Sequence, residues 1–147
     1  MRINTRTRYA TRALLELALR EGEGAISLQQ IAASQDLSLK YLESLFSALR
    51  GAGLVQSARG SQGGYRLARP AGRITLRDVY DVFESHETFV SCVGNPEECR
   101  RAVDCVAREV WCELFEQTMS KLEATTVAAL ADRARERQQA KVLDYAI

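Results

Sequence analysis

The sequence contains little histidine and proline and no long apolar run, and these absences exclude several classes of protein. One histidine in 147 residues leaves little scope for acid–base catalysis by imidazole. No Ser/His/Asp, paired-carboxylate or metal-hydrolase arrangement stands out, so we expect neither an enzyme nor a small-molecule substrate. No run approaches the roughly 18 to 20 apolar residues of a membrane span, and the first six residues open no signal-peptide core. We therefore expect a cytoplasmic protein without membrane contact.

Disorder and low complexity are excluded as well. The content of 46% apolar and 27% charged residues is that of a globular protein. Two prolines and nine glycines suit a mostly helical chain with few turns. The length fits one ordinary domain, or one domain with an appended helix.

The net charge of +1 conceals an uneven distribution of charged residues. Residues 1–70 contain 10 Lys or Arg and 5 Asp or Glu, whereas residues 71–147 contain 10 and 14. A basic first half suits a polyanionic partner such as nucleic acid.

Hydrophobic periodicity predicts three helices in the first half of the chain. The first follows Thr5 or Thr7 as its cap. The second starts after Ser27, with Gln30 at the position that a capping box requires. The third starts after Ser38 and ends at a pair of glycines.

A hairpin and further helices are predicted after the third helix. Residues 54–57 and 65–67 form two short strands joined by a glycine-rich turn. A helix follows over 74–83, and residues 85–104 then show no periodicity. A long helix with a wide apolar stripe starts near Cys105, and such helices often pack against their own copy in a homodimer.

The predicted fold class is therefore mainly α, a winged helix-turn-helix with a short β-hairpin wing and a long dimerisation helix. We divide it into three parts. Residues 1–70 form the DNA-binding region, 71–104 a helix and a cysteine-bearing loop, and 105–147 the dimerisation helix and a C-terminal helix.

The predicted third helix and the wing carry residues suited to DNA. A helix-turn-helix places the start of its second helix in the major groove, and a wing arginine suits a narrow minor groove. The simpler alternatives are that Tyr41 packs inside the fold, that Glu43 is a solvated residue and that the glycines only form a turn. Together, helix, wing and charge favour double-stranded promoter DNA. The candidate DNA-binding residues are Ser38, Lys40, Tyr41, Glu43, Ser44, Arg59, Ser61 and Gly63.

Four cysteines follow in the second half, with the spacing Cys92-x6-Cys99-x5-Cys105-x6-Cys112. This is not the paired CxxC pattern of a zinc knuckle. Three thiolates spread over a loop, Cys92, Cys99 and Cys105, suit an iron–sulfur cluster, [2Fe-2S] or [4Fe-4S]. Cys112 is expected roughly 10 Å from Cys105 along a helix, as a thiol that is buried or faces a partner, or alternatively as a fourth ligand or redox partner. The alternative nitrogen ligand is His86.

These motifs resemble those of the bacterial Rrf-two family of winged-helix transcriptional regulators. The matching stretches are RYATRAL (8–14), LSLKYLE (37–43), LFSALR (45–50), GLV (53–55) and RGSQGGYRL (59–67). The first three cysteines and Trp111 extend the resemblance to about residue 130. The resemblance implies a homodimer that binds operator DNA through helix and wing, and a cluster held by the three cysteines.

The resemblance leaves the fourth cluster ligand open. One type of family member has a histidine where Arg108 stands, and another has an acidic residue where Arg8 stands. The candidates are Cys112, His86 and Glu109, or an exogenous ligand to a three-cysteine site.

Three hypotheses follow for the function. The first is a regulator whose operator affinity depends on the cluster and so on iron, cluster status, redox state or nitric oxide. The second keeps the DNA binding and replaces the cluster by a thiol–disulfide switch. The third is a small redox electron carrier, which predicts no salt-dependent binding to DNA.

Overall fold

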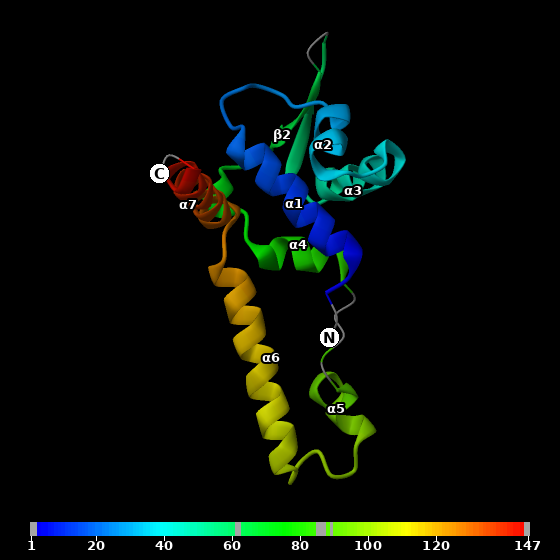
Figure 1. Ribbon diagram of the computed structural model, residues 1–147. Helices are drawn as coiled ribbons and strands as arrows, with labels where there is room; N and C mark the ends of the chain where they lie inside the picture. Colours follow the sequence, from blue (N-terminus) through cyan, green and yellow to red (C-terminus); the bar gives the residue numbers. More distant parts are fainter. Residues whose placement is uncertain (1–2, 61–62, 85–87, 89, 146–147) are drawn as a thin grey trace.

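The N-terminal half of the chain folds as a winged helix-turn-helix (Figure 1), in a computed structural model that describes residues 3–60, 63–84, 88 and 90–145. Strands β1 and β2 pair antiparallel, with Val55 opposite Leu67 and Ala58 opposite Gly64. The predicted fold class is confirmed. The elements of this half are α1 (Thr5–Leu19), α2 (Leu28–Gln35), α3 (Leu39–Gly51), β1 (Val55–Ala58) and β2 (Gly64–Leu67).

The cap of α1 differs from the prediction. Asn4, and neither Thr5 nor Thr7, is the N-cap, and its side chain accepts a hydrogen bond from the Thr7 backbone N–H at 2.9 Å. Thr7 lies inside the helix and is buried, and its hydroxyl hydrogen bonds to Asn4 and to Glu84, near the end of another helix. The prediction of a threonine cap was wrong because a distant contact holds Thr7 in the helix.

The starts of α2 and α3 match the sequence pattern. Ser27 and Gln30 form a reciprocal capping box, in which the Ser27 N–H donates to Gln30 Oε1 at 2.9 Å. Asp36 adopts the left-handed conformation, with φ of 52°, in the short connection. Ser38 then caps α3 by accepting from the Tyr41 N–H at 3.3 Å. Local hydrogen bonds thus fix the starts of both helices of the helix-turn-helix.

The second half adds a long helix that leaves the body of the molecule and a last helix that returns to it. Figure 1 shows α6 extending away from the winged helix, with α5 beside its far end, and α7 beside α1. In the described part of the chain, no helix is long and apolar enough to cross a membrane. The elements are η1 (Ala71–Arg73), α4 (Leu76–Phe83), α5 (Ser91–Gly94), η2 (Pro96–Glu98), α6 (Val106–Ala124) and α7 (Val127–Tyr145).

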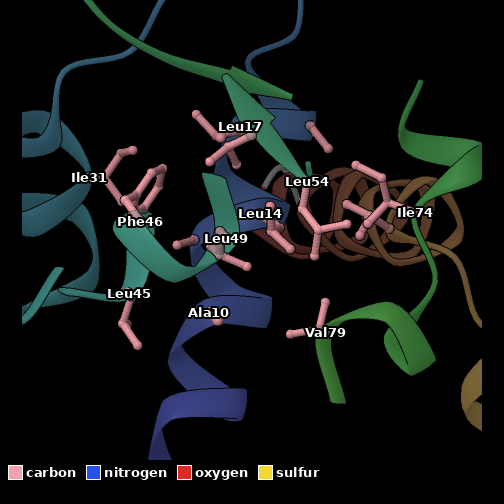
Figure 2. Close-up of a cluster of buried hydrophobic side chains, with 14 of the residues drawn as sticks. Ala10, Leu14, Leu17, Ile31, Leu45, Phe46, Leu49, Leu54, Ile74 and Val79 are labelled. Carbon is pink, nitrogen blue, oxygen red and sulfur yellow. The ribbon is translucent and has the colours of Figure 1, made fainter. Parts of the chain in front are cut away.

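One hydrophobic core joins the winged helix to the second half. Figure 2 shows side chains of α1, α2 and α3 packed together with those of Leu54, Ile74 and Val79. Val127 and Ala131 of α7 belong to the same cluster. Each large side chain buried here contributes roughly 1.5–3 kcal/mol. The core therefore fixes the position of α3, whose inner face it buries completely.

Candidate nucleic-acid interface and cysteine segment

The outer face of α3 is polar and exposed. Leu42, Leu45, Phe46 and Leu49 are fully buried on the inner face, so the helical period turns the intervening residues outward. Ser38 is exposed at the start of the helix, and its hydroxyl caps α3 by accepting the hydrogen bond from the Tyr41 N–H. The exposed candidate DNA-binding residues on the helix itself are Lys40, Glu43 and Ser44.

Tyr41 is half-buried and packs against α1. Its ring meets the ring of Tyr9 edge-on, with centroids 6.0 Å apart. The Arg12 guanidinium lies 5.3 Å from the centre of the Tyr9 ring and donates to Gln35 Oε1 at 2.8 Å, at the end of α2. Tyr9 and Arg12 therefore hold both helices of the helix-turn-helix against α1. The positioning role of Arg12 was not predicted, although its spacing of three residues from Tyr9 puts the two on one helix face.

The base of the wing is fixed between α3 and the segment before α2. Ile26 and Tyr65 exchange two backbone hydrogen bonds, of 2.9 and 2.8 Å. A Cβ atom on Gly64 would lie 2.4 Å from the Ile26 carbonyl oxygen, so only glycine fits there. The Tyr65 ring packs against Phe46 of α3 at a centroid distance of 4.7 Å. The Tyr65 ring therefore connects the wing directly to α3.

The tip of the wing carries Arg59, which is exposed just beyond β1. Gly60 has φ of +117°, a conformation that L side chains rarely adopt. The Gly63 N–H donates to the Gly60 carbonyl at 2.9 Å and closes the turn. Ser61, also a candidate DNA-binding residue, lies outside the described residues.

The four cysteines lie on and around the far end of α6. Cys92 is in α5, Cys99 follows η2, Cys105 precedes α6 as its N-cap, and Cys112 is one residue after Trp111 in α6. All four are half-buried free thiols. Three thiols in this short stretch suit an iron–sulfur cluster chemically. Across the described residues, however, no three His, Cys, Asp or Glu side chains are grouped so that they could hold a metal ion.

Arg108 connects α6 to the cysteine segment, which runs from Cys92 to Cys105. Its Nε donates to the Cys92 backbone carbonyl at 2.7 Å. Among the candidates for a fourth ligand, Cys112 is half-buried one turn further on the same helix face as Arg108, and Glu109 is exposed. His86, the remaining candidate, lies outside the described residues.

Glu84 joins the end of α4 to the start of α1. Its carboxylate accepts from the Asn4 N–H at 2.8 Å, from Asn4 Nδ2 at 3.1 Å and from the Thr7 hydroxyl. Asn4 Nδ2 also donates to the Phe83 carbonyl at 2.9 Å, and the Arg6 guanidinium lies 5.1 Å from the centre of the Phe83 ring. The chain continues from Glu84 toward Cys92, so this joint links the cysteine segment with the helix that supports Tyr41. The joint was not predicted because it spans 80 residues.

Asp78 in α4 links the exit of the wing to the second half. Arg69 pairs with its carboxylate at 3.1 Å, and the Thr75 N–H donates to it at 2.8 Å. Burial acts to raise the pKa of Asp78, but the hydrogen bonds from Thr75 and Arg69 outweigh burial and lower the pKa below its ordinary value. Asp78 therefore remains ionised over the pH range in which proteins usually work.

The surface of α6 is apolar on one side. Val106, Val110, Trp111 and Leu114 are between 41% and 75% exposed. An apolar groove of about 280 Å³ lies between α1, α4 and α6, and it is lined in part by Ile3, Leu76, Tyr80 and Leu122. The helix and the groove together form an apolar surface of the kind that marks a protein interface.

Comparison with known proteins gives matches along most of the chain. The model of the family described as "Rrf2: Iron-dependent Transcriptional regulator" matches residues 3–133. Protein rrf2 of Nitratidesulfovibrio vulgaris is 39% identical over 130 residues, which are 88% of this chain and 87% of that protein.

Two solved structures have the same fold at similar sequence identity. CymR (YrzC), described as the global cysteine regulator of B. subtilis, has a TM-score of 0.76 and 36% identity, over 90% of this chain and 98% of that chain. IscR of T. potens also has a TM-score of 0.76 and 36% identity, over 94% of this chain and 91% of that chain.

Proposed function

Because the chain belongs to the Rrf2 family of DNA-binding transcriptional regulators, we propose that it binds operator DNA as a homodimer whose affinity is set by an iron–sulfur cluster on the cysteine segment. Its relatives are transcriptional regulators and not enzymes. The observation that carries the proposal is the exposed polar face of α3 next to a wing that packs on the same helix.

In this proposal, α3 enters the major groove and the wing follows the neighbouring minor groove. Lys40 and Ser44 contact phosphates or base edges, and Glu43 accepts a hydrogen bond from a cytosine amino group. Arg59 enters the minor groove, and the wing residues Ser61 and Gly63 approach the backbone. The remaining two candidates are Ser38, which fixes the start of α3, and Tyr41, which fixes the tilt of α3 through Tyr9.

The homodimer is proposed to form through α6. The exposed side chains of Val110, Trp111 and Leu114 form an apolar stripe along one side of the helix. A second copy of α6, with the apolar groove beside it, would bury this stripe. Two winged helices related by a twofold axis then meet two half-sites of an operator.

Cys92, Cys99 and Cys105 are the residues proposed to hold the cluster, and the family description as iron-dependent supports a link to iron. When bound, a cluster supplies a redox-active and nitric-oxide-sensitive group with its own charge. Arg108 is not a ligand, because a guanidinium has no acceptor lone pair. To hold one cluster, the three cysteines must lie closer together than they do in this structure. The 2.7 Å hydrogen bond from Arg108 Nε to the Cys92 carbonyl would keep the cysteine segment against α6 during that change.

Glu84 is the proposed route from the cysteine segment to the DNA-binding surface. In this proposal, a change in the cysteine segment alters the hydrogen bonds that the Glu84 carboxylate accepts from Asn4 and Thr7. These residues start α1, on which Tyr9 supports Tyr41 of α3. The tilt of α3 would therefore follow the state of the cysteine segment.

A thiol–disulfide switch is the second candidate function. The state of the cysteines favours it. All four are free thiols, and among the described residues they do not form a group that could hold a metal ion. In such a switch, oxidation of two thiols would tighten the segment against α6, and Cys112 is available as a partner.

The two candidates are separated by the composition of the protein. We expect anaerobically purified protein to contain iron and sulfide and Cys92→Ser to contain neither. Cys112→Ser identifies the fourth ligand: it loses both if Cys112 is that ligand and retains both if it is not. Colourless protein without iron or sulfide contradicts the cluster. Intact-mass measurement of free thiols before and after a mild oxidant then tests the switch.

DNA binding is tested by genomic footprinting with and without iron or nitric oxide. We expect protected promoter sites whose occupancy changes with these additions and whose affinity falls as salt rises. Absence of any preference for promoter fragments over random duplex, in either condition, would leave only the electron carrier.

A further inference from the structure

Leu39, the first residue of α3, is a large apolar side chain on a surface where the other outward residues are polar. It is 36% exposed, whereas the nearby apolar residues Leu37 and Tyr41 pack against the core. The exposure of Leu39 is thus not explained by packing within the chain.

Contact with a second copy does not explain it either. Most of the other large exposed apolar residues lie on the cysteine segment and α6, and Figure 1 shows α6 running away from α3. The exceptions are Ile3, which precedes α1, Val90, which precedes α5, and Val142, which lies in α7. A dimer formed through α6 leaves Leu39 uncovered.

The position of Leu39 puts it beside a residue proposed to contact bases. Leu39 and Glu43 are four residues apart, so they lie on the same edge of α3, one turn from each other. Ser38 and Lys40, on either side of Leu39 in the sequence, are exposed as well. Leu39 therefore occupies the end of α3 that a helix-turn-helix inserts into the major groove.

We propose that Leu39 contacts the 5-methyl group of a thymine and selects thymine close to the cytosine that Glu43 contacts. This inference rests on the proposed function, because it requires α3 to lie in the major groove. Thymine is the base that presents a methyl group there, and apolar side chains recognise it. Four residues of helix rise about 6 Å, which is close to two base-pair steps of about 3.4 Å. The thymine therefore lies within two base pairs of that cytosine.

The test starts from operators selected by the full-length protein from a random duplex library. Selection with Glu43→Ala identifies the cytosine, because its preference disappears. Each thymine within two base pairs is then replaced by deoxyuridine, which removes only the methyl group, and the Kd is measured by fluorescence anisotropy. We expect one replacement to weaken wild-type binding roughly fourfold, the value of one buried methyl-sized group.

Two variants decide whether Leu39 makes the contact. Leu39→Ala should bind thymine and deoxyuridine operators equally while its melting temperature stays unchanged. Lys40→Ala, the matched control, should bind all duplexes more weakly and keep the methyl dependence. Any of three results would overturn the proposal. The wild type could bind both operators equally, Leu39→Ala could retain the methyl dependence, or the selected sites could lack thymine near the cytosine. If selection enriches no sequence, or the Glu43 variant keeps every base preference, the proposed use of α3 is itself wrong.

Discussion

The Asn4 N–H donates to Glu84 Oε1 at 2.8 Å, which ties the residue immediately before α1 to the residue immediately after α4. The Asn4 side chain caps α1 and donates to both Phe83 and Glu84. Asn4 thus both caps α1 and connects α1 to the end of α4. The position of α1, and with it the support for α3, depends on this pair.

Removal of the Glu84 carboxylate should destabilise the fold. Glu84→Ala leaves the Asn4 N–H without its acceptor and the Thr7 hydroxyl with only the longer bond to Asn4 Oδ1, of 3.3 Å. We expect a loss of about 1–2 kcal/mol of unfolding free energy, measured by denaturant titration. Glu136→Ala, on the exposed side of α7, is the control and should change stability by less than about 0.5 kcal/mol. Equal stabilities of the two variants would contradict the importance of this joint.

The proposed dimer face can be tested by adding charge to it. Leu114→Glu puts a carboxylate into the apolar stripe on α6, and we expect the dimer dissociation constant, from analytical ultracentrifugation, to rise about tenfold or more. Operator affinity should fall with it. Ser120→Glu adds the same charge at an exposed position about 120° away from Leu114 around the helix and should leave the dimer intact. An unchanged dimer in Leu114→Glu would show that another surface mediates association.

The wing requires glycine at position 64, whereas position 72, in η1 after the wing, has room for a side chain. Gly64→Ala would put a Cβ atom 2.4 Å from the Ile26 carbonyl oxygen, and we expect it to cost about 1–3 kcal/mol of stability. Gly72→Ala meets only the Ala128 Cβ at 4.0 Å and should change stability by less than about 0.5 kcal/mol. Thermal unfolding of the two variants makes the comparison, and a stable Gly64→Ala protein would mean that β2 can move away from Ile26.

Much of the fold could be predicted because its signals are local. Ser27 with Gln30, and Ser38, cap helices within a few residues, and these predictions are confirmed. Thr75 and Asp78 cap α4 by hydrogen bonds that are equally local. The motifs of helix and wing likewise indicated the family, which is confirmed by the match over residues 3–133.

The remaining features depend on contacts between distant segments. The hydrogen bond from Arg12 to Gln35 spans 23 residues of sequence, and those from Asn4 to Glu84 span 80. Sequence periodicity therefore does not predict them. The last turns of α7 carry few apolar residues, so sequence periodicity does not mark where that helix ends. Which residues contact DNA and which cysteines hold a cluster stay predictions.

The ion pair between Arg69 and Asp78 should make stability depend on acid pH. The pKa of Asp78 is lowered in the folded protein, so its contribution is present above the unfolded value of 3.8 and is lost as the pH falls through the lower folded value. Asp78→Asn removes this contribution and part of the capping box, and we expect it to cost about 0.5–2 kcal/mol at neutral pH. Urea titrations from pH 7 to pH 3 should show the variant and the wild type converging below about pH 4. Asp81→Asn, which removes an exposed ion pair with Arg77 on the same helix, should cost less than about 0.5 kcal/mol at neutral pH. A difference between Asp78→Asn and wild type that stayed constant over the whole range would mean that the carboxylate charge does not stabilise the start of α4.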